Sequence, residues 1–143
     1  MFLVRLVYAS RASDSFSGDQ IGRLLETARE NNTKKDVTGI LCFHRNYFLQ
    51  CLEGSRTAVN EVYHGILNDD RHYDPVLLDY TEIDQREFKD WSMAYLPDSS
   101  LTKDLNLEFS GSAVFNPFAM TGESSHQLLL KALKTLPSLP DSE

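Results

Sequence analysis

The stretch VTGILCFHRNYFLQCLEG, residues 37–54, carries the clearest fold signal in the chain. Two apolar runs flank a polar triplet at residues 44–46, which is typical of a β-hairpin. In the second run Phe48, Gln50 and Leu52 alternate with their neighbours and therefore share one face of a strand. A carboxamide between two large apolar side chains must find hydrogen bonds when it is buried. Gln50 either satisfies a neighbouring backbone group or serves a ligand.

A strand and an amphipathic helix are predicted before the hairpin. Residues 2–8 alternate, and Tyr8 falls on the uniformly apolar face of this strand. Ser17–Gln20 has the form of a capping box, and apolar residues follow at helical spacing: Ile21, Leu24, Leu25 and Ala28. Asn31 and Asn32 continue this stripe, where apolar residues would be expected. A C-terminal cap is one explanation for Asn31, but a single cap leaves Asn32 unexplained.

The same pattern follows the hairpin. A second amphipathic helix begins at Ser55, a charged loop spans residues 68–72, and residues 76–83 have the pattern of a strand. Residues 91–96 alternate as a fifth strand, in which Trp91, Met93 and Tyr95 share a face. The order predicts an α+β, ferredoxin-like βαββαβ sheet plus a fifth strand, with two helices on one face.

The predicted sheet brings polar residues together inside an apolar layer. By strand parity Gln50 and Met93 join Tyr8 on the helix face, and Asn32 points inward from the first helix. A groove between the two helices, lined by a tyrosine and two carboxamides, is a candidate ligand site. Two short helical patterns, Leu101–Leu107 and Ser124–Leu136, form a C-terminal tail.

Composition excludes several classes of protein. The 143 residues suit one domain with a real core, and the net charge of −7 argues against nucleic acid and against anionic membrane surfaces as partners. No run approaches the roughly 20 apolar residues of a spanning helix. Cys42 and Cys51, the two cysteines, lie in apolar runs and are expected to be reduced core residues of a cytoplasmic protein.

The usual signatures of enzymes are not found in the sequence. The four histidines, at positions 44, 64, 72 and 126, have no nucleophile or metal-ligand motif around them. A glycine-rich phosphate loop and a dinucleotide fingerprint are also absent from the sequence. We therefore expect a planar ligand read by amides beside a tyrosine, and no enzymatic activity.

Six stretches resemble, in order and spacing, the motifs of BLUF domains, the sensors of blue light using FAD. They are Arg5–Ser10, Asn31–Asn32, Val37–Leu41, Phe48–Gly54, Asp69–His72 and Trp91–Met93. The resemblance covers residues 1–96, which we expect to form the photosensor domain, and leaves residues 97–143 as a C-terminal helical extension. Ala28 departs from the pattern, since some members carry Ser there, and this removes one auxiliary hydrogen bond near the flavin ring.

The resemblance implies a role for each of three polar residues, Asn32 in binding the flavin and Tyr8 and Gln50 in its photochemistry. In similar proteins Asn32 would bond the flavin C2 carbonyl and N3 edge, and Gln50 would lie between Tyr8 and the N5/O4 edge. Blue light makes the flavin a strong oxidant, so Tyr8 transiently gives up an electron and a proton. Recombination leaves Gln50 rotated or tautomerised, and a stronger hydrogen bond at O4 shifts the absorption to the red. The flavin supplies the photochemistry and the protein supplies orientation.

The same resemblance suggests the remaining contacts. Arg71 and His72 are expected near the ribityl phosphate, unless they form only a solvated charged turn. Met93 and Trp91 compete for the place beside Gln50. The predicted cofactor-binding residues are Tyr8, Leu24, Asn31, Asn32, Leu41, Phe48, Gln50, Ile66, Arg71 and His72.

The family resembled also bears on the cofactor and the output. FAD is the expected cofactor, with FMN as the alternative. The short, stand-alone members with a helical tail act through a downstream protein partner or through their own assembly, so an unidentified partner and a homo-oligomer are expected.

Two other functions compete with photoreception. An acylphosphatase-like hydrolase uses a similar scaffold, but the loop Ala9–Asp14 lacks the glycines of an anion cradle. A light-independent flavin- or ligand-binding regulatory module would show no photochemistry. The colour of the purified protein separates these readings.

Overall fold

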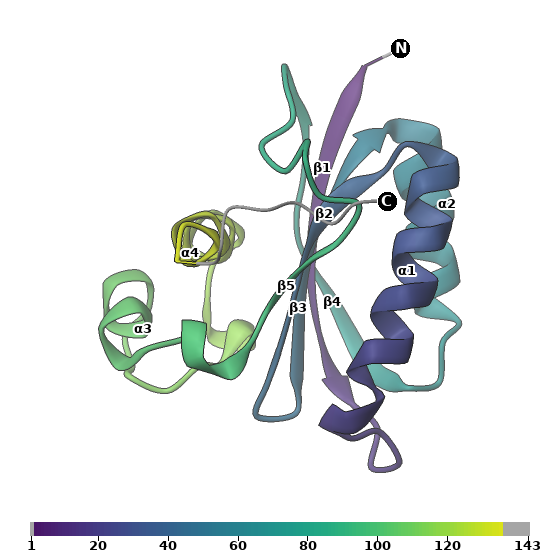
Figure 1. Ribbon diagram of the computed structural model, residues 1–143. Coiled ribbons are helices and arrows are strands. Elements are labelled where there is room, and N and C mark those ends of the chain that lie inside the picture. The colour runs from purple at the N-terminus through teal and green to yellow at the C-terminus, as the bar shows by residue number, and fades with distance from the viewer. Residues whose placement is uncertain (1, 136–143) are drawn as a thin grey trace.

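A five-stranded sheet with strand order β4-β1-β3-β2-β5 forms the centre of the molecule (Figure 1). The computed structural model describes residues 2–135 of the 143. The elements in chain order are β1 (Leu3–Ala12), η1 (Gly18–Gln20), α1 (Ile21–Lys35), β2 (Thr38–His44), β3 (Tyr47–Ser55), α2 (Arg56–Leu67), β4 (His72–Ile83), β5 (Ala94–Leu96), η2 (Asp98–Ser100), α3 (Lys103–Phe109), η3 (Pro117–Ala119) and α4 (Gly122–Leu133).

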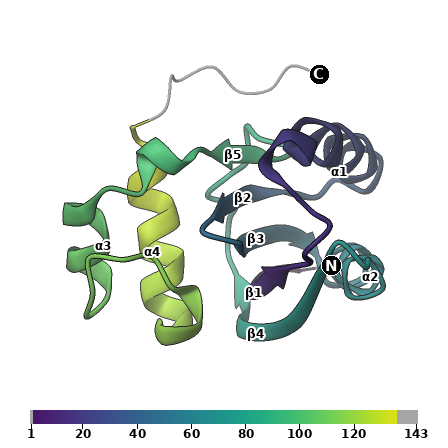
Figure 2. The same ribbon diagram turned by 90° about the horizontal axis from the view of Figure 1, so that it is seen from below.

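The predicted ferredoxin-like arrangement is confirmed. Strands β1 to β4 pair antiparallel, and β5 joins the edge of β2 in parallel. Helices α1 and α2 cover one face, whereas α3 and α4 lie on the opposite side of the sheet (Figures 1 and 2). The helices predicted near residues 101–107 and 124–136 correspond to α3 and α4, although Leu136 lies outside the described residues.

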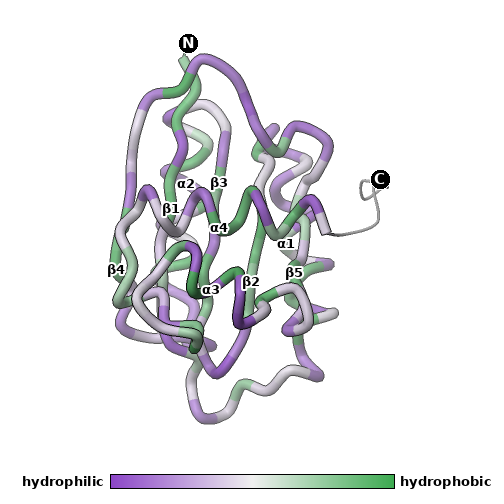
Figure 3. Tube along the Cα trace, turned by 90° about the vertical axis from the view of Figure 1, so that its left-hand side faces the viewer, coloured by the Kyte–Doolittle hydropathy of each residue, from purple (hydrophilic) through white to green (hydrophobic). Residues whose placement is uncertain are grey.

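Both faces of the central strands are therefore buried, each in its own apolar cluster, whereas the edge strand β4 is largely exposed. The cluster beneath α1 and α2 contains Tyr8, Leu41 and Met93, whereas the cluster beneath α4 contains Cys42, Cys51 and residues of the tail. Figure 3 shows apolar residues along the central strands and polar residues in many of the connections. Both cysteines are free and buried, as predicted.

The hairpin between β2 and β3 has the geometry that its sequence suggested. Arg45 and Asn46 both have positive φ, 55° and 67°, as the two-residue turns of tightly twisted hairpins require. The strands approach closely at Gly39, where a Cβ atom would stand 2.1 Å from the carbonyl oxygen of Cys51. Only glycine fits this position without moving a backbone.

Two helix-end predictions have different outcomes. The capping box at Ser17 and Gln20 is present, although it caps a 3₁₀ turn that leads into α1. The alternative that Asn31 caps the helix does not hold, because α1 continues to Lys35 and ends at Asp36, which has φ of 56°. An exposed aspartate in the left-handed conformation gives little sequence signal.

The predicted fifth strand is wrong in length and in the direction of one side chain. Residues 84–93 form bends and turns, and β5 contains only Ala94–Leu96. Met93 is 0% exposed in the cluster beneath α1 and α2, but Trp91 packs against the cluster beneath α4. Strand alternation does not hold here, because the segment is not paired as a regular strand before Ala94.

Candidate functional site

A cavity of about 360 Å³ lies between α1 and α2 and reaches down to the sheet. Its floor comes from β1, β2 and β3, and its sides come from the facing surfaces of the two helices. All ten residues predicted to contact a cofactor line it: Tyr8, Leu24, Asn31, Asn32, Leu41, Phe48, Gln50, Ile66, Arg71 and His72. The volume falls at the lower end of the range of small-molecule sites.

A buried chain of hydrogen bonds crosses the floor of this cavity. Tyr8 and Gln50 are partners across the β1–β3 ladder, and the Tyr8 hydroxyl donates to Gln50 Oε1 at 2.5 Å. Gln50 Nε2 donates in turn to Sδ of Met93 at 3.5 Å. Thioether sulfur is a weak acceptor. The carboxamide oxygen of Gln50 therefore accepts a short hydrogen bond from Tyr8, whereas its nitrogen donates only to the weak acceptor Met93 Sδ.

The environment keeps Tyr8 in its neutral form. Burial raises the pKa of Tyr8 far above the ordinary value of 10.0, and the nearby Tyr63 and Asp69 raise it further. The Tyr63 ring lies 5.5 Å away between centroids. A neutral phenol is a hydrogen-bond donor, which agrees with the short contact to Gln50.

Asn32 connects helix α1 to the backbone that precedes β5. Its side chain is 2% exposed, and Nδ2 donates to the carbonyl oxygen of Ser92 at 2.8 Å. Asn32 also lines the cavity, so its carboxamide is placed to contact a ligand there. Asn31, in contrast, is exposed at the edge of the cavity.

The apolar walls surround this polar floor. Leu24 and Ile66 come from the two helices, and Leu41 and Phe48 from the hairpin. Phe48 is fixed by aromatic contacts with Phe16 and Phe43, at 5.3 and 4.8 Å between ring centroids. A planar apolar ring with polar edges matches such a lining.

A charged cluster follows α2 at the edge of the cavity. The Arg71 guanidinium contacts both carboxylate oxygens of Asp69, at 2.9 Å from Nε and 2.5 Å from Nη2. Hydrogen bonds from Arg71 hold the pKa of Asp69 below its usual value. Asp69 thus orients the Arg71 guanidinium.

His72 leaves one ring nitrogen available to a ligand. Its Nε2 lies 2.6 Å from the carbonyl oxygen of Ile66, so this nitrogen carries the hydrogen. Its Nδ1 is then an acceptor, and it is buried without a partner among the described residues. An orphaned acceptor beside the cavity fits a hydroxyl-bearing cofactor chain, such as the ribityl group of a flavin.

Several other lining residues were not among the predicted cofactor-binding residues, although Ala28 was already expected near the flavin ring: Thr27, Ala28, Lys35, Glu61, Val62, Gly65 and Asp69. Those in the helices, except Glu61, lie next to a predicted residue or one helical turn from it, so helical spacing could have identified them. Neither Met93 nor Trp91 lines the cavity; Met93 reaches it through Gln50. Within residues 2–135, no group of three or more His, Cys, Asp or Glu could hold a metal ion, and no helix could cross a membrane.

Comparison with known families agrees with this geometry. The family model described as BLUF, sensors of blue-light using FAD, matches residues 3–94. The chain belongs to the BLUF family. The match includes β1 through the start of β5, and therefore every residue that lines the cavity. BLUF domains bind a flavin, and the unpartnered Nδ1 of His72 and the apolar walls of this cavity fit that cofactor.

Relatives differ in how much of each chain is matched. The blue light- and temperature-regulated antirepressor BluF of Escherichia coli K12 is 39% identical over 80 residues, which are 54% of this chain and 20% of that protein. The photoactivated adenylate cyclase subunit beta of Euglena longa is 29% identical over 100 residues, or 69% of this chain and 12% of that protein. The chain thus spans a fifth or less of these two proteins.

Solved BLUF structures extend the similarity into the helical tail. The photo-activated state of BlsA superposes with a TM-score of 0.85 at 29% identity and covers 95% of this chain and 98% of that one. The dark-state structure of the BLUF protein BlrB gives a TM-score of 0.75 at 29% identity, with 92% and 95% covered.

Proposed function

We propose that this chain is a blue-light photoreceptor that holds a flavin noncovalently in the cavity between α1 and α2. The observation that carries the proposal is the buried series Tyr8–Gln50–Met93 on the cavity floor. Asn32 and Gln50 would read the polar edges of the ring, and Leu24 and Ile66 would enclose its faces. Arg71 and His72 would contact the ribityl chain and phosphate.

The protein's own residues would carry the light response. The bound flavin supplies blue absorption and, when excited, a strong oxidising potential. Tyr8 then gives up an electron and its hydroxyl proton, and both return. Gln50 is the group that rearranges, because loss of the Tyr8 donor frees its Oε1 and the sulfur of Met93 holds its nitrogen only weakly. The altered hydrogen bond between Gln50 and the edge of the flavin ring would distinguish the light state from the dark state.

We propose FAD as the cofactor. The family description names FAD, although one solved relative, BlrP1 of Klebsiella pneumoniae, is 30% identical and contains FMN. Release of the cofactor by denaturation, followed by chromatography and mass spectrometry, distinguishes the two.

We also propose that residues 1–96 form the photosensor and residues 97–143 the extension that carries the output, of which residues 136–143 lie outside the described part. The chain itself would have no enzymatic activity and would act on a partner protein or through its own assembly. The names of its relatives support control of another activity by light, since one is a blue light- and temperature-regulated antirepressor and another is a photoactivated adenylate cyclase subunit.

An absorption spectrum before and after blue light tests the proposal. The protein should be yellow, and the visible band should shift to the red without bleaching. Cys42 and Cys51 lie in the cluster on the α4 side and do not line the cavity, so a cysteinyl adduct is not expected. A colourless protein would favour a hydrolase, and a yellow protein without a shift would favour a light-independent flavin module.

A further inference from the structure

Residues 86–93, here called the connecting segment, join the two faces of the sheet. They follow β4 and lead into β5, and they place Met93 in one cluster and Phe88 in the other. The segment therefore touches both the proposed flavin side and the tail side within a few residues.

Its C-terminal end is held by the cavity. Gln50 donates to Met93 Sδ, as described, and Asn32 donates to the Ser92 carbonyl oxygen. Arg29 Nε also donates to the carbonyl oxygen of Met93, at 3.0 Å. Any rearrangement of Gln50 or Asn32 thus changes a contact to the segment directly.

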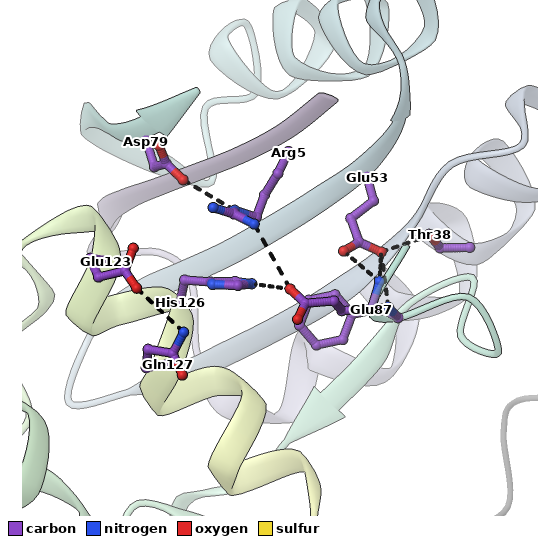
Figure 4. Close-up of polar contacts among 9 residues, drawn as sticks. Arg5, Thr38, Glu53, Asp79, Glu87, Glu123, His126 and Gln127 are labelled. Atoms are coloured by element: carbon purple, nitrogen blue, oxygen red, sulfur yellow. Dashed lines mark hydrogen bonds and ion pairs between the residues drawn. The ribbon is translucent and has the colours of Figure 1, made fainter. Parts of the chain in front are cut away.

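Its N-terminal end is fixed to the sheet by a buried carboxylate. Glu53, 0% exposed, accepts from the backbone N–H groups of Glu87 and Phe88, each at 2.9 Å (Figure 4). Burial raises the pKa of Glu53, and these two N–H donors oppose part of that rise. Glu53 lies on β3, the strand of Gln50, but on the opposite face. Arg86 adds bonds to Thr38 Oγ1 and to the carbonyl oxygens of Asp36 and Glu53.

The same end contacts helix α4. The Glu87 carboxylate lies 2.7 Å from Nε2 of His126, which is 3% exposed, and 3.8 Å from Nη1 of Arg5 (Figure 4). The contact to His126 is short but poorly aligned for a hydrogen bond, so a small movement changes its strength. Arg5 is also paired with Asp79 at 3.1 Å, and Phe88 packs edge-on against the His126 ring.

We propose that the contact between Glu87 and His126 transmits the state of Gln50 to helix α4. The inference rests on the proposed photoreceptor function and names its output contact. When Gln50 rearranges, its Nε2 no longer donates to Met93, and the connecting segment is released at its cavity end. Glu87 and Phe88 then shift against Glu53, and α4 loses part of what holds it to the sheet. A rearrangement of Gln50 can shift the equilibrium between the dark and the light conformation only through contacts that differ between these two conformations.

The experiment compares hydrogen exchange of the α4 amides, residues 122–133, in the dark and under blue light. The variant is Glu87→Gln, which keeps the shape of a half-exposed side chain but removes its charge. The control is Glu123→Gln: this carboxylate is also on α4 and its charge also acts on His126, but it accepts its hydrogen bond from Gln127 on the same helix and not from the connecting segment. The flavin spectrum of each protein is recorded in parallel.

We expect light to speed α4 exchange in the wild type and in Glu123→Gln by about 5-fold or more, as for typical couplings between sites. In Glu87→Gln the exchange should be the same in dark and light, while the red shift stays normal. A normal red shift with unchanged α4 exchange in the wild type would overturn the inference, as would a full difference in Glu87→Gln. A wild type without any red shift would instead refute the photoreceptor function.

Discussion

The phenol of Tyr8 stands directly across the β1–β3 ladder from Gln50, and its hydroxyl is bonded to Oε1 of that side chain. Because the two residues are ladder partners, their relative position is set by backbone hydrogen bonds and not by flexible side chains alone. The neighbouring Tyr63 ring packs against Tyr8 without a hydrogen bond to Gln50. The two tyrosines therefore offer a matched test of the hydroxyl.

Tyr8→Phe should retain flavin and lose the red shift completely. The ring volume is unchanged, but the residue can no longer supply a proton, and Gln50 Oε1 loses its donor. Losing that donor should lower the free energy of unfolding by about 1–3 kcal/mol. Difference spectra after blue light measure the shift, with Tyr63→Phe as the control that keeps it. A normal photocycle in Tyr8→Phe would exclude Tyr8 as the donor.

Asn32→Ala should weaken flavin binding by about 1–3 kcal/mol, since it leaves buried polar groups unpaired. Asn31→Ala should weaken it less, because Asn31 is exposed at the edge of the cavity. Flavin retention during dialysis, followed by absorbance, gives both values. An equal loss of flavin affinity in the two variants would show that the burial of Asn32 does not determine its contribution to flavin binding.

Met93→Leu should leave flavin binding and the red shift largely intact but remove the light-dependent change in exchange across residues 91–107. Leucine keeps the volume at this fully buried site, so stability should fall by less than about 1.5 kcal/mol. What is lost is the sulfur that accepts from Gln50. Hydrogen exchange in the two states is the measurement. A change confined to the hairpin at residues 44–47 would contradict this route.

Stability should fall as the pH rises above the ordinary tyrosine pKa of 10.0. Tyr8 resists ionisation in the folded chain but not in the unfolded one, so the unfolded state loses its proton first and is favoured by alkali. Burial raises the pKa of Tyr63 and Tyr95 as well, so they add to the slope. Denaturant unfolding at about pH 8 and about pH 11 should show a larger loss in wild type than in Tyr8→Phe.

Gly39→Ala should destabilise the fold by about 1–3 kcal/mol or more, because the new methyl group meets the backbone of Cys51. Gly22→Ala is the matched control. Nothing lies within 4 Å of its added Cβ, and alanine should stabilise α1 there by about 0.5–1 kcal/mol. Thermal unfolding of the two variants checks the opposite signs.

Most of the features that the sequence could predict belong to the regular helices and strands. Alternation in β1 and β3 was enough to put Tyr8 and Gln50 on the same face, because period-2 patterns fix side-chain direction wherever strands pair. The inward position of Asn32 followed from the helical spacing after Ile21. The residues that line the cavity were predictable where they belong to regular helices and strands.

The irregular parts were not predictable in the same way. Residues 84–93 have no period, so the opposite directions of Trp91 and Met93 depend on long-range contacts such as the bond from Gly39 N–H to the Trp91 carbonyl oxygen. The position of α4 on the far face, and with it the contact of His126 to Glu87, joins residues far apart in the chain. No local pattern in the sequence encodes either feature.

Because Cys42 and Cys51 are buried beneath the tail, their reaction with a thiol reagent can report opening of this part of the structure. Both thiols are 0% exposed, and burial raises the pKa of each, so neither forms the reactive thiolate while the layer is closed. A thiol reagent can reach them when the tail helices separate from the sheet or when the chain unfolds. The rate of labelling of the unmodified protein, in darkness and in light, therefore counts these openings without any introduced probe.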